Sequence, residues 1–188
     1  TKSVGEYVLL PYIKKYLQTP ENQIDYLVDN TEHLLELLNH GELDFVVVEG
    51  IFDKQHYDWM LFQNEPYIGI CAKDHPFAGR RIILREKGSG TRRIFEWELE
   101  NSGYTVASFA RKITISSFEI IKELVRDGFG VSFLYEAVVK GRADLAQFTC
   151  PPLTGTHEFN VVYLKNTGAG EIAQRFLAQP EHAGRIPH

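Results

Sequence analysis

The stretch Ile-Ile-Leu-Arg-Glu-Lys-Gly-Ser-Gly-Thr-Arg-Arg-Ile-Phe-Glu-Trp at residues 82–97 decides how the chain is organised. Its first three residues are apolar and predict a short buried strand, which Gly88 and Gly90 then break. Thr91 can cap a helix that the apolar residues of the following turns continue. The stretch therefore predicts a strand, a tight glycine turn and a helix N-terminus.

A helix N-terminus leaves backbone N–H groups unpaired and carries the positive end of the helix dipole, so this turn is suited to an anion. Lys87, Arg92 and Arg93 place positive charge against the same terminus, a conflict that a bound carboxylate, sulfate or phosphate would remove. Alternatively, the glycines only shape the turn and the arginines extend into solvent. The G-x-x-x-x-G-K-[ST] spacing of a nucleotide P-loop is absent.

The composition is that of a globular chain with enough apolar residues for a core. Its 188 residues, 44% of them hydrophobic, allow one domain or two small lobes. A net charge of -5 and a pI of about 5.8 argue against direct binding of nucleic acid, because phosphate contacts need clustered Lys and Arg. Cys71 and Cys150 stand in apolar contexts and indicate buried thiols. No motif indicates a metal or another cofactor, and no apolar run or leader indicates a membrane partner.

Apolar runs that alternate with helical patterns predict a parallel sheet covered by helices. We expect strands at 24–28, 43–48, 59–62, 67–72, 82–84, within 106–115, and at 131–134, 143–150 and 159–164. We expect helices at 1–17 with a break at Pro11, from Asn30 or Thr31 to Gly41, from Thr91 to Ser102, after Ser116 or Ser117, and at 168–177. Ser3 and Glu6 have the spacing of a capping box, and Ile120, Ile121, Leu124 and Val125 form the apolar face of one helix.

Ligands of such sheets bind beyond the carboxyl ends of the strands, which points to Val48, Glu49 and Gly50. Glu49 could instead be a solvated loop carboxylate. Stiff or glycine-marked crossings near 72–76 and 151–155 predict two lobes joined by two strands, with the binding site in the cleft between them. In that cleft Ser89, Thr91 and the N–H groups of Gly90 and Thr91 would hold an anion, with Ser3 and Ser116 or Ser117 opposite. Arg92 would add charge if its side chain turns inward.

Several short segments, in this order, resemble the effector-binding domain of the LysR-type transcriptional regulators. They are Ser3-Val4-Gly5-Glu6-Tyr7 with Leu10-Pro11, Gly41-Glu42-Leu43-Asp44-Phe45 through Glu49-Gly50, Lys73-Asp74-His75-Pro76-Phe77, Arg85-Glu86-Lys87-Gly88-Ser89-Gly90-Thr91-Arg92, and Glu119-Ile120-Ile121-Lys122 with Val125 and Gly128-Phe129-Gly130-Val131. The resemblance runs nearly from end to end of the chain.

The resemblance implies an α/β fold of two Rossmann-like lobes joined by two crossover strands, as in type II periplasmic binding proteins. Lobe I would comprise residues 1–72 plus 155–188, and lobe II residues 73–154. It implies a ligand-sensing domain that binds a small, anionic metabolite in the cleft. The effector-binding residues it implies are Ser3, Val4, Val48, Glu49, Gly50, Ser89, Gly90, Thr91, Arg92, Ser116, Ser117, Gly130, Ser132 and Phe133.

The resemblance also implies partners. They are promoter DNA, bound through a winged helix-turn-helix that this chain lacks, and further copies of the chain in a homodimer or homotetramer in the cytoplasm. The chain departs from the family in lacking the linker helix and the first strand of the effector domain. It also departs in a short connection, where Arg80 is followed directly by Arg81. Either a loop left out between Arg80 and Arg81 or a true deletion would explain this short connection.

Two other functions fit the same fold. One is an exported solute-binding protein that feeds a transporter. The other is an enzyme, because residues 91–95 loosely resemble the Thr-Arg-Phe motif of prephenate dehydratases. No general acid and base pair is evident, so we expect no catalytic residues. Phe118, Phe129 and Phe133 could select an aromatic effector, but the core is their more common place.

Overall fold

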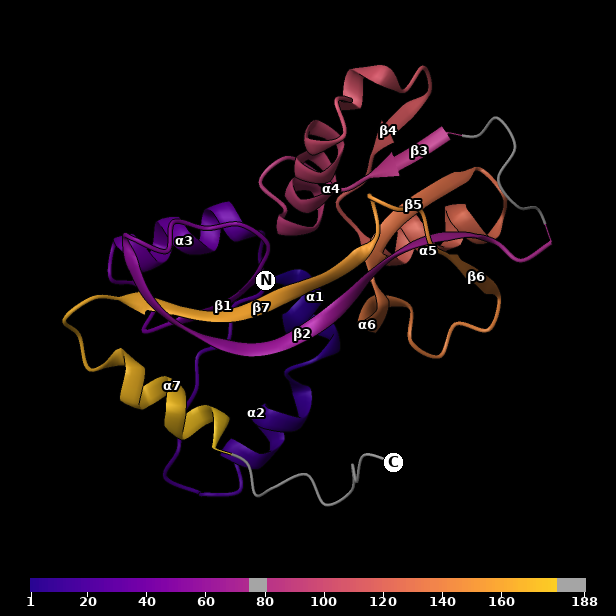
Figure 1. The fold of residues 1–188 in the computed structure, drawn as a ribbon. Coiled ribbons are helices and arrows are strands. Elements are labelled where there is room, and N and C mark those ends of the chain that lie inside the picture. The colour runs from indigo at the N-terminus through magenta and orange to yellow at the C-terminus, as the bar shows by residue number, and fades with distance from the viewer. Residues whose placement is uncertain (75–80, 179–188) are drawn as a thin grey trace, which may run out of the picture.

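The structure is a computed structural model that describes residues 1–74 and 81–178 (Figure 1). The expected turn at His75-Pro76, Arg80 of the Arg80–Arg81 junction, and the tail from Pro180 to His188 lie outside the described residues. The helices are α1 (Lys2–Tyr7), α2 (Leu10–Tyr16), α3 (Thr31–Asn39), α4 (Gly90–Asn101), α5 (Phe118–Arg126), α6 (Glu136–Val139) and α7 (Ala169–Leu177), with a 3-10 turn at Val106–Ser108. The strands are β1 (Val46–Glu49), β2 (Tyr57–Ala72), β3 (Arg81–Leu84), β4 (Lys112–Thr114), β5 (Gly130–Tyr135), β6 (Leu145–Phe148) and β7 (Gly155–Leu164).

One sheet runs through the molecule in the order β1-β7-β2-β5-β3-β4, with β6 paired to β2. The long strands β2 and β7 pair with each other and connect the two halves of the molecule (Figure 1). We call the part with α1, α2, α3, β1 and α7 the first lobe, and the part with α4, α5, β3, β4, β5 and β6 the second lobe. The expected α/β fold of two lobes joined by two crossing strands is thus confirmed.

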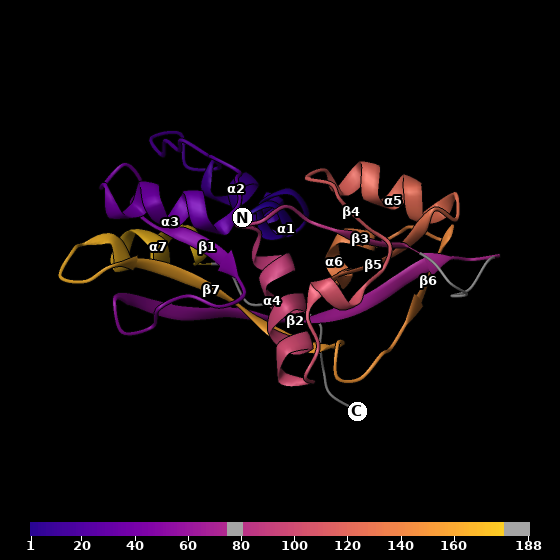
Figure 2. The same cartoon turned by 90° about the horizontal axis from the view of Figure 1, so that it is seen from above.

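The sheet is mixed, whereas the apolar runs predicted a parallel one. β3 pairs in parallel with β4 and β5, but β1 with β7, β2 with β7 and β2 with β5 are antiparallel. An apolar run reports that both faces of a strand are covered, and it carries no information on strand direction. The prediction of parallel pairing is therefore right only for β3 with β4 and with β5, which lie side by side in the second lobe (Figure 2).

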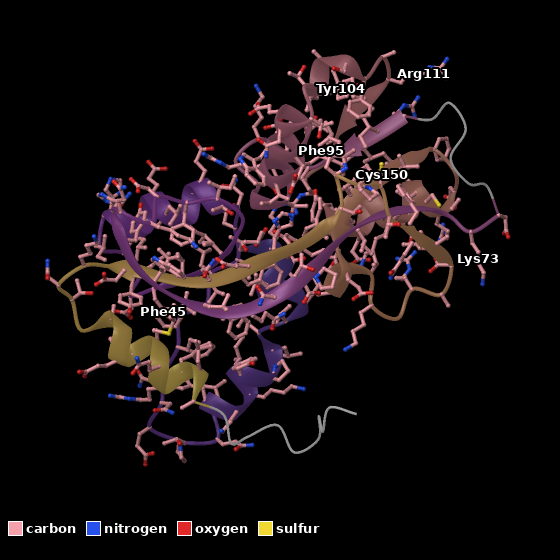
Figure 3. All side chains as sticks on the ribbon, viewed as in Figure 1. Phe45, Lys73, Phe95, Tyr104, Arg111 and Cys150 are labelled. Atoms are coloured by element: carbon pink, nitrogen blue, oxygen red, sulfur yellow. The ribbon has the colours of Figure 1, made fainter. Side chains whose placement is uncertain are left out.

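The hydrophobic core is continuous between the lobes. Its largest cluster joins Val4 and Val47 of the first lobe with Phe95 and Ile121 of the second. Figure 3 shows Phe95 inside the second lobe, whereas Tyr104 lies near the end of that lobe and is exposed. A smaller cluster packs α3 against β1 and β7. The two lobes therefore share one hydrophobic core.

The start of the chain corrects one prediction and confirms another. Ser3 does not cap a helix, since α1 begins at Lys2 and Ser3 lies inside it, fully buried. Its hydroxyl is engaged by residues far away in the sequence, which spacing alone cannot reveal. Pro11 lies in the first turn of α2, so the predicted break and restart of the helix is confirmed.

Three further local predictions are wrong. Residues 24–28 form no strand. The strands expected at 59–62 and 67–72 are one 16-residue strand, because the polar residues between them pair with β7 after a register shift at Leu61 and Gln63. The N-cap of α4 is Ser89, which places Thr91 in the first turn. By contrast, the strand expected within 106–115 is confirmed as β4, which follows a 3-10 turn.

No helix within residues 1–74 and 81–178 combines the length and the apolar character that crossing a bilayer requires.

The two neighbouring isoleucines of α5 provide a test of the fold. Ile121 is fully buried, whereas Ile120 is 52% exposed, although the sequence placed both on the apolar face. We expect Ile121→Ala to lower the free energy of unfolding by about 2–5 kcal/mol, because it leaves a cavity. Ile120→Ala should change it by less than about 1 kcal/mol. Urea unfolding of both variants measures this difference, and equal losses would contradict the packing of α5.

Candidate functional site

The two lobes touch where β1 ends and α4 begins. Glu49 is the last residue of β1 and Gly90 the first of α4. A Cβ atom added to Gly90 would lie 2.3 Å from the carbonyl oxygen of Glu49, so this approach requires glycine. Gly50, with φ at +87°, turns the chain directly after the contact. The glycine turn that the sequence singled out is therefore a contact surface between the lobes.

Three predicted site residues meet at this contact, and we call them the Glu49 cluster: Ser3 of α1, Glu49 of β1 and Thr91 of α4. The Ser3 hydroxyl donates to Glu49 Oε1 at 3.1 Å and lies 3.0 Å from Thr91 Oγ1. Thr91 Oγ1 lies 3.4 Å from the same carboxylate oxygen. All three residues are buried. The hydroxyls predicted to hold an anion thus hold a carboxylate of the protein itself.

The Glu49 carboxylate is in an unusual environment for a charge. Burial raises the pKa of its carboxyl above the ordinary value, although the Thr1 ammonium, the Arg85 guanidinium and the Ser3 hydrogen bond act to lower it. Glu49 Oε1 accepts from the cluster, whereas Oε2 is buried without a hydrogen-bond partner among the described residues. One carboxylate oxygen therefore has unused capacity to accept a hydrogen bond.

Tyr67 of β2 fixes the position of the cluster from the sheet. Its buried hydroxyl lies 2.9 Å from the carbonyl oxygen of Thr91 and 3.2 Å from that of Phe133, with either as acceptor. Phe133 is a predicted site residue that contributes here through its backbone. Its ring packs against Phe95 and Phe148 at centroid distances of 5.1 and 5.6 Å and belongs to the aromatic core.

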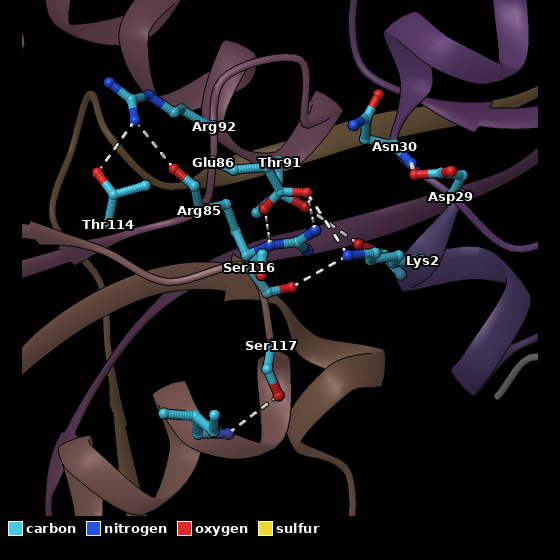
Figure 4. Close-up of polar contacts among 12 residues, drawn as sticks. Lys2, Asp29, Asn30, Arg85, Glu86, Thr91, Arg92, Thr114, Ser116 and Ser117 are labelled. Atoms are coloured by element: carbon cyan, nitrogen blue, oxygen red, sulfur yellow. Dashed lines mark hydrogen bonds and ion pairs between the residues drawn. The ribbon is translucent and has the colours of Figure 1, made fainter.

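Arg85, which directly follows β3, brings a positive charge close to the contact between the lobes (Figure 4). Its side chain is 1% exposed, and its guanidinium lies over the Phe118 ring at 4.0 Å from the centroid. Nε and Nη2 donate to the Glu86 carboxylate at 2.8 and 2.9 Å, while Nη1 has no partner within the described residues. Lys2 of α1 reaches across from the first lobe, donating to the Ser116 carbonyl at 3.2 Å and lying 3.7 Å from Glu86.

Arg92, the arginine that the sequence predicted for the site, makes its contacts within the second lobe. Its guanidinium contacts Glu96 at 2.7 Å, the Arg85 carbonyl at 3.0 Å and the Thr114 hydroxyl at 3.4 Å. Figure 4 shows it on the far side of Thr91 from Lys2. The arginine beside Lys2 is Arg85 instead.

The predicted serines differ in what their hydroxyls do. Ser117 caps α5, accepting from the N–H of Ile120 at 3.4 Å. Ser116 is exposed and contributes its carbonyl to Lys2. The Ser89 hydroxyl at the start of α4 is buried and, within the described part of the chain, has no partner. Of the three, Ser89 alone combines burial with unused hydrogen-bonding capacity.

The other predicted site residues serve packing and the sheet. Val4 and Val48 are fully buried in the hydrophobic clusters. Ser132 donates to the Ile83 carbonyl at 2.7 Å. Gly130 allows β5 to approach β3, since a Cβ atom there would lie 2.5 Å from the carbonyl oxygen of residue 81.

A groove of about 790 Å³ between α3 and α4 leads toward the Glu49 cluster. Thr31 and Ser89 line it and have buried hydroxyls without partners in residues 1–74 and 81–178. Lys87, Arg92 and Arg93 line its wall together with four carboxylates, those of Glu32, Glu36, Glu96 and Glu100. Gly90 also lines it and touches Glu49, so a small molecule in the groove would lie close to the cluster.

Sequence reasoning missed Arg85 and Lys2. Arg85 directly follows β3, and Glu49 is the last residue of β1, so the rule on carboxyl ends of strands selects both residues. Lys2 neighbours Ser3, which the sequence selected. Within the described residues, no three or more His, Cys, Asp or Glu side chains gather in a way that could hold a metal ion.

The buried Glu49 carboxyl predicts a pH dependence of stability. Because its pKa is raised in the folded state, the folded chain binds its proton more tightly than the unfolded chain. The Glu49 carboxyl therefore contributes fully to the free energy of unfolding below pH 4.5, its ordinary pKa. This contribution is lost as pH rises through the higher pKa of the folded state. We expect urea unfolding to show Glu49→Gln gaining stability relative to the parent across this window, by at most about 1.4 kcal/mol per pH unit.

The exposed Glu171→Gln variant is the matched control and should keep the parent's pH dependence. Parallel curves for the parent and Glu49→Gln would show that Glu49 titrates normally.

Known proteins share both the sequence pattern and this architecture. The family model described as LysR substrate binding domain matches residues 1–183. The HTH-type transcriptional regulator CysL of Bacillus subtilis is 30% identical over 150 residues, which are 73% of this chain and 49% of CysL. The chain spans about half the length of the curated relatives it matches.

Solved structures agree with the fold. The regulatory domain of CcmR from Synechocystis PCC6803, solved in complex with 2-PG, superposes with a TM-score of 0.79 at 21% identity, covering 94% of this chain and 92% of that one. A sulfate-bound regulatory domain of OxyR2 from Vibrio vulnificus gives a TM-score of 0.73 at 13% identity, covering 94% and 89%. By its family match along nearly the whole chain, this protein belongs to the LysR substrate binding domain family.

Proposed function

We propose that the chain is the effector-sensing domain of a DNA-binding transcriptional regulator and that it binds a small anionic metabolite between its lobes. Lobe I would comprise residues 1–72 plus 155–188 and lobe II residues 73–154. Promoter DNA would be bound by a separate N-terminal domain of the whole protein. The regulator would work in the cytoplasm as a homodimer or homotetramer, without catalysing a reaction.

The observation that carries the anion proposal is the pair of cations at the lobe contact. Arg85 holds a buried guanidinium whose Nη1 is unpaired among the described residues, and Lys2 reaches toward the same region from the opposite lobe. Glu86 neutralises one charge of the two. An unpaired buried donor costs free energy, and an anionic group is the partner that offsets most of it.

The known neighbours support the same kind of ligand. The sulfate-bound OxyR2 domain holds an anion, and CcmR was solved with 2-PG. Here Arg85 and Lys2 would receive the anionic group, with the Ser3 and Thr91 hydroxyls and the Gly90 turn beside it. A ligand that bridges the lobes could favour one lobe arrangement, which is the differential affinity that switching requires.

A thermal-shift screen of this chain tests the proposal. The panel contains sulfate, phosphate, dicarboxylates, amino-acid derivatives and aromatic acids. An anion at one hundred times its dissociation constant should add about 2.7 kcal/mol, which raises the unfolding midpoint by about 5–10 °C. Arg85→Gln should raise the dissociation constant of that anion by about thirtyfold or more, because it removes a buried charge-assisted partner.

Two further variants make the result specific. Arg85→Lys keeps the charge and should retain part of the affinity. Arg126→Gln removes an exposed arginine of α5 and should leave binding unchanged. If no anion in the panel raises the midpoint of the parent, the anion proposal fails.

A further inference from the structure

Two buried polar atoms without partners lie on opposite sides of the lobe contact. Glu49 Oε2 belongs to the first lobe and Arg85 Nη1 to the second, and neither has a hydrogen-bond partner among the described residues. Buried polar groups are nearly always paired in folded proteins, and an unpaired one costs about 1–3 kcal/mol. Each atom therefore indicates a position where a bound molecule would gain a hydrogen bond.

The protein itself already provides hydrogen-bond partners for the other polar atoms of both groups. Ser3 and Thr91 surround Glu49 Oε1, and the Glu86 carboxylate takes Nε and Nη2 of Arg85. These contacts hold the carboxylate and the guanidinium in place, so the unpaired Oε2 and Nη1 are the atoms left for a ligand. The two groups are also neighbours in space, since Ser3, which contacts Glu49, directly follows Lys2, whose ammonium lies 3.7 Å from the Glu86 carboxylate that holds Arg85.

The two positions require opposite chemistry. A guanidinium N–H needs an acceptor, and an anionic one is best. A carboxylate oxygen accepts only, so the group that faces Glu49 must bring an O–H or N–H donor. A second anionic group at Glu49 would meet a like charge in a buried place. An anion without a donor group therefore pairs with Arg85 but is repelled by the Glu49 carboxylate.

We propose that the effector is a small acid that carries an O–H or N–H donor close to its anionic group, as hydroxy acids and amino acids do. The anionic group pairs with Arg85 and the donor pairs with Glu49. This inference rests on the proposed function and adds a requirement to it: Glu49 is the residue that selects among anions.

The test uses pairs of acids that differ in the donor alone: malate with succinate, aspartate with succinate, and lactate with propionate. Isothermal titration of this chain at pH 7.5 measures both members of each pair. In at least one pair we expect the acid with the donor to bind about tenfold or more tightly, because a site built for a donor is left unpaired by the analogue that lacks it.

The Glu49→Gln variant tests whether Glu49 causes this preference. A glutamine amide offers both a donor and an acceptor, so it no longer opposes an acid without a donor. The preference within the pair should then fall to less than about threefold. Thr154→Val changes a hydroxyl that serves the loop at Cys150 and is the control that should keep the preference.

The outcomes separate the two proposals. Equal binding of both members to the parent, or a preference that survives Glu49→Gln, overturns the donor requirement while the anion site stands. Absence of binding by every acid, together with no stabilisation by sulfate or phosphate, overturns the proposed function and this inference with it.

Discussion

The structure depends on one close approach, that of the Gly90 backbone to the Glu49 carbonyl. A side chain at Gly90 would lie 2.3 Å from that oxygen, so any other residue would push α4 away from β1. The approach places Thr91 of one lobe within 3.0 Å of Ser3 of the other, and both against the Glu49 carboxylate. The cluster exists because the glycine turn lets two lobes meet through backbone.

The same approach explains why the fold tolerates a buried carboxylate at Glu49. The N-terminus of α4 presents positive potential to Glu49, and two hydroxyls donate to or surround one of its oxygens. Burial opposes the charge, and the Arg85 guanidinium partly offsets that effect. The helix terminus that could bind an external anion thus already has an internal one nearby. In the proposed function, an external anion is consequently directed to Arg85 and Lys2.

The sequence predicted the glycine turn, the two-lobe fold and Glu49 because each rests on local pattern: an apolar run, a break and the residue that follows a strand. It misplaced Ser3 as a cap and did not single out Arg85. Both errors have one physical cause. Ser3 is engaged by Glu49, 46 positions away, and Arg85 is covered by the distant Phe118. Residue type and spacing do not report which distant side chain will cover a polar group.

The wrong strand predictions have the same origin. The polar residues at 63–66 read as a loop, yet β7 pairs with them and makes β2 continuous between the lobes. That continuity bears on function, because a strand that belongs to both lobes can bend but cannot separate them. Contacts between the lobes, such as Tyr7 to Glu119 at 2.9 Å and Lys2 to Ser116, are the ones that a ligand bound between the lobes would change. A small molecule between Glu49 and Arg85 would replace direct lobe contacts with its own, and the energy difference between those two sets of contacts is what a regulator of this architecture can transmit.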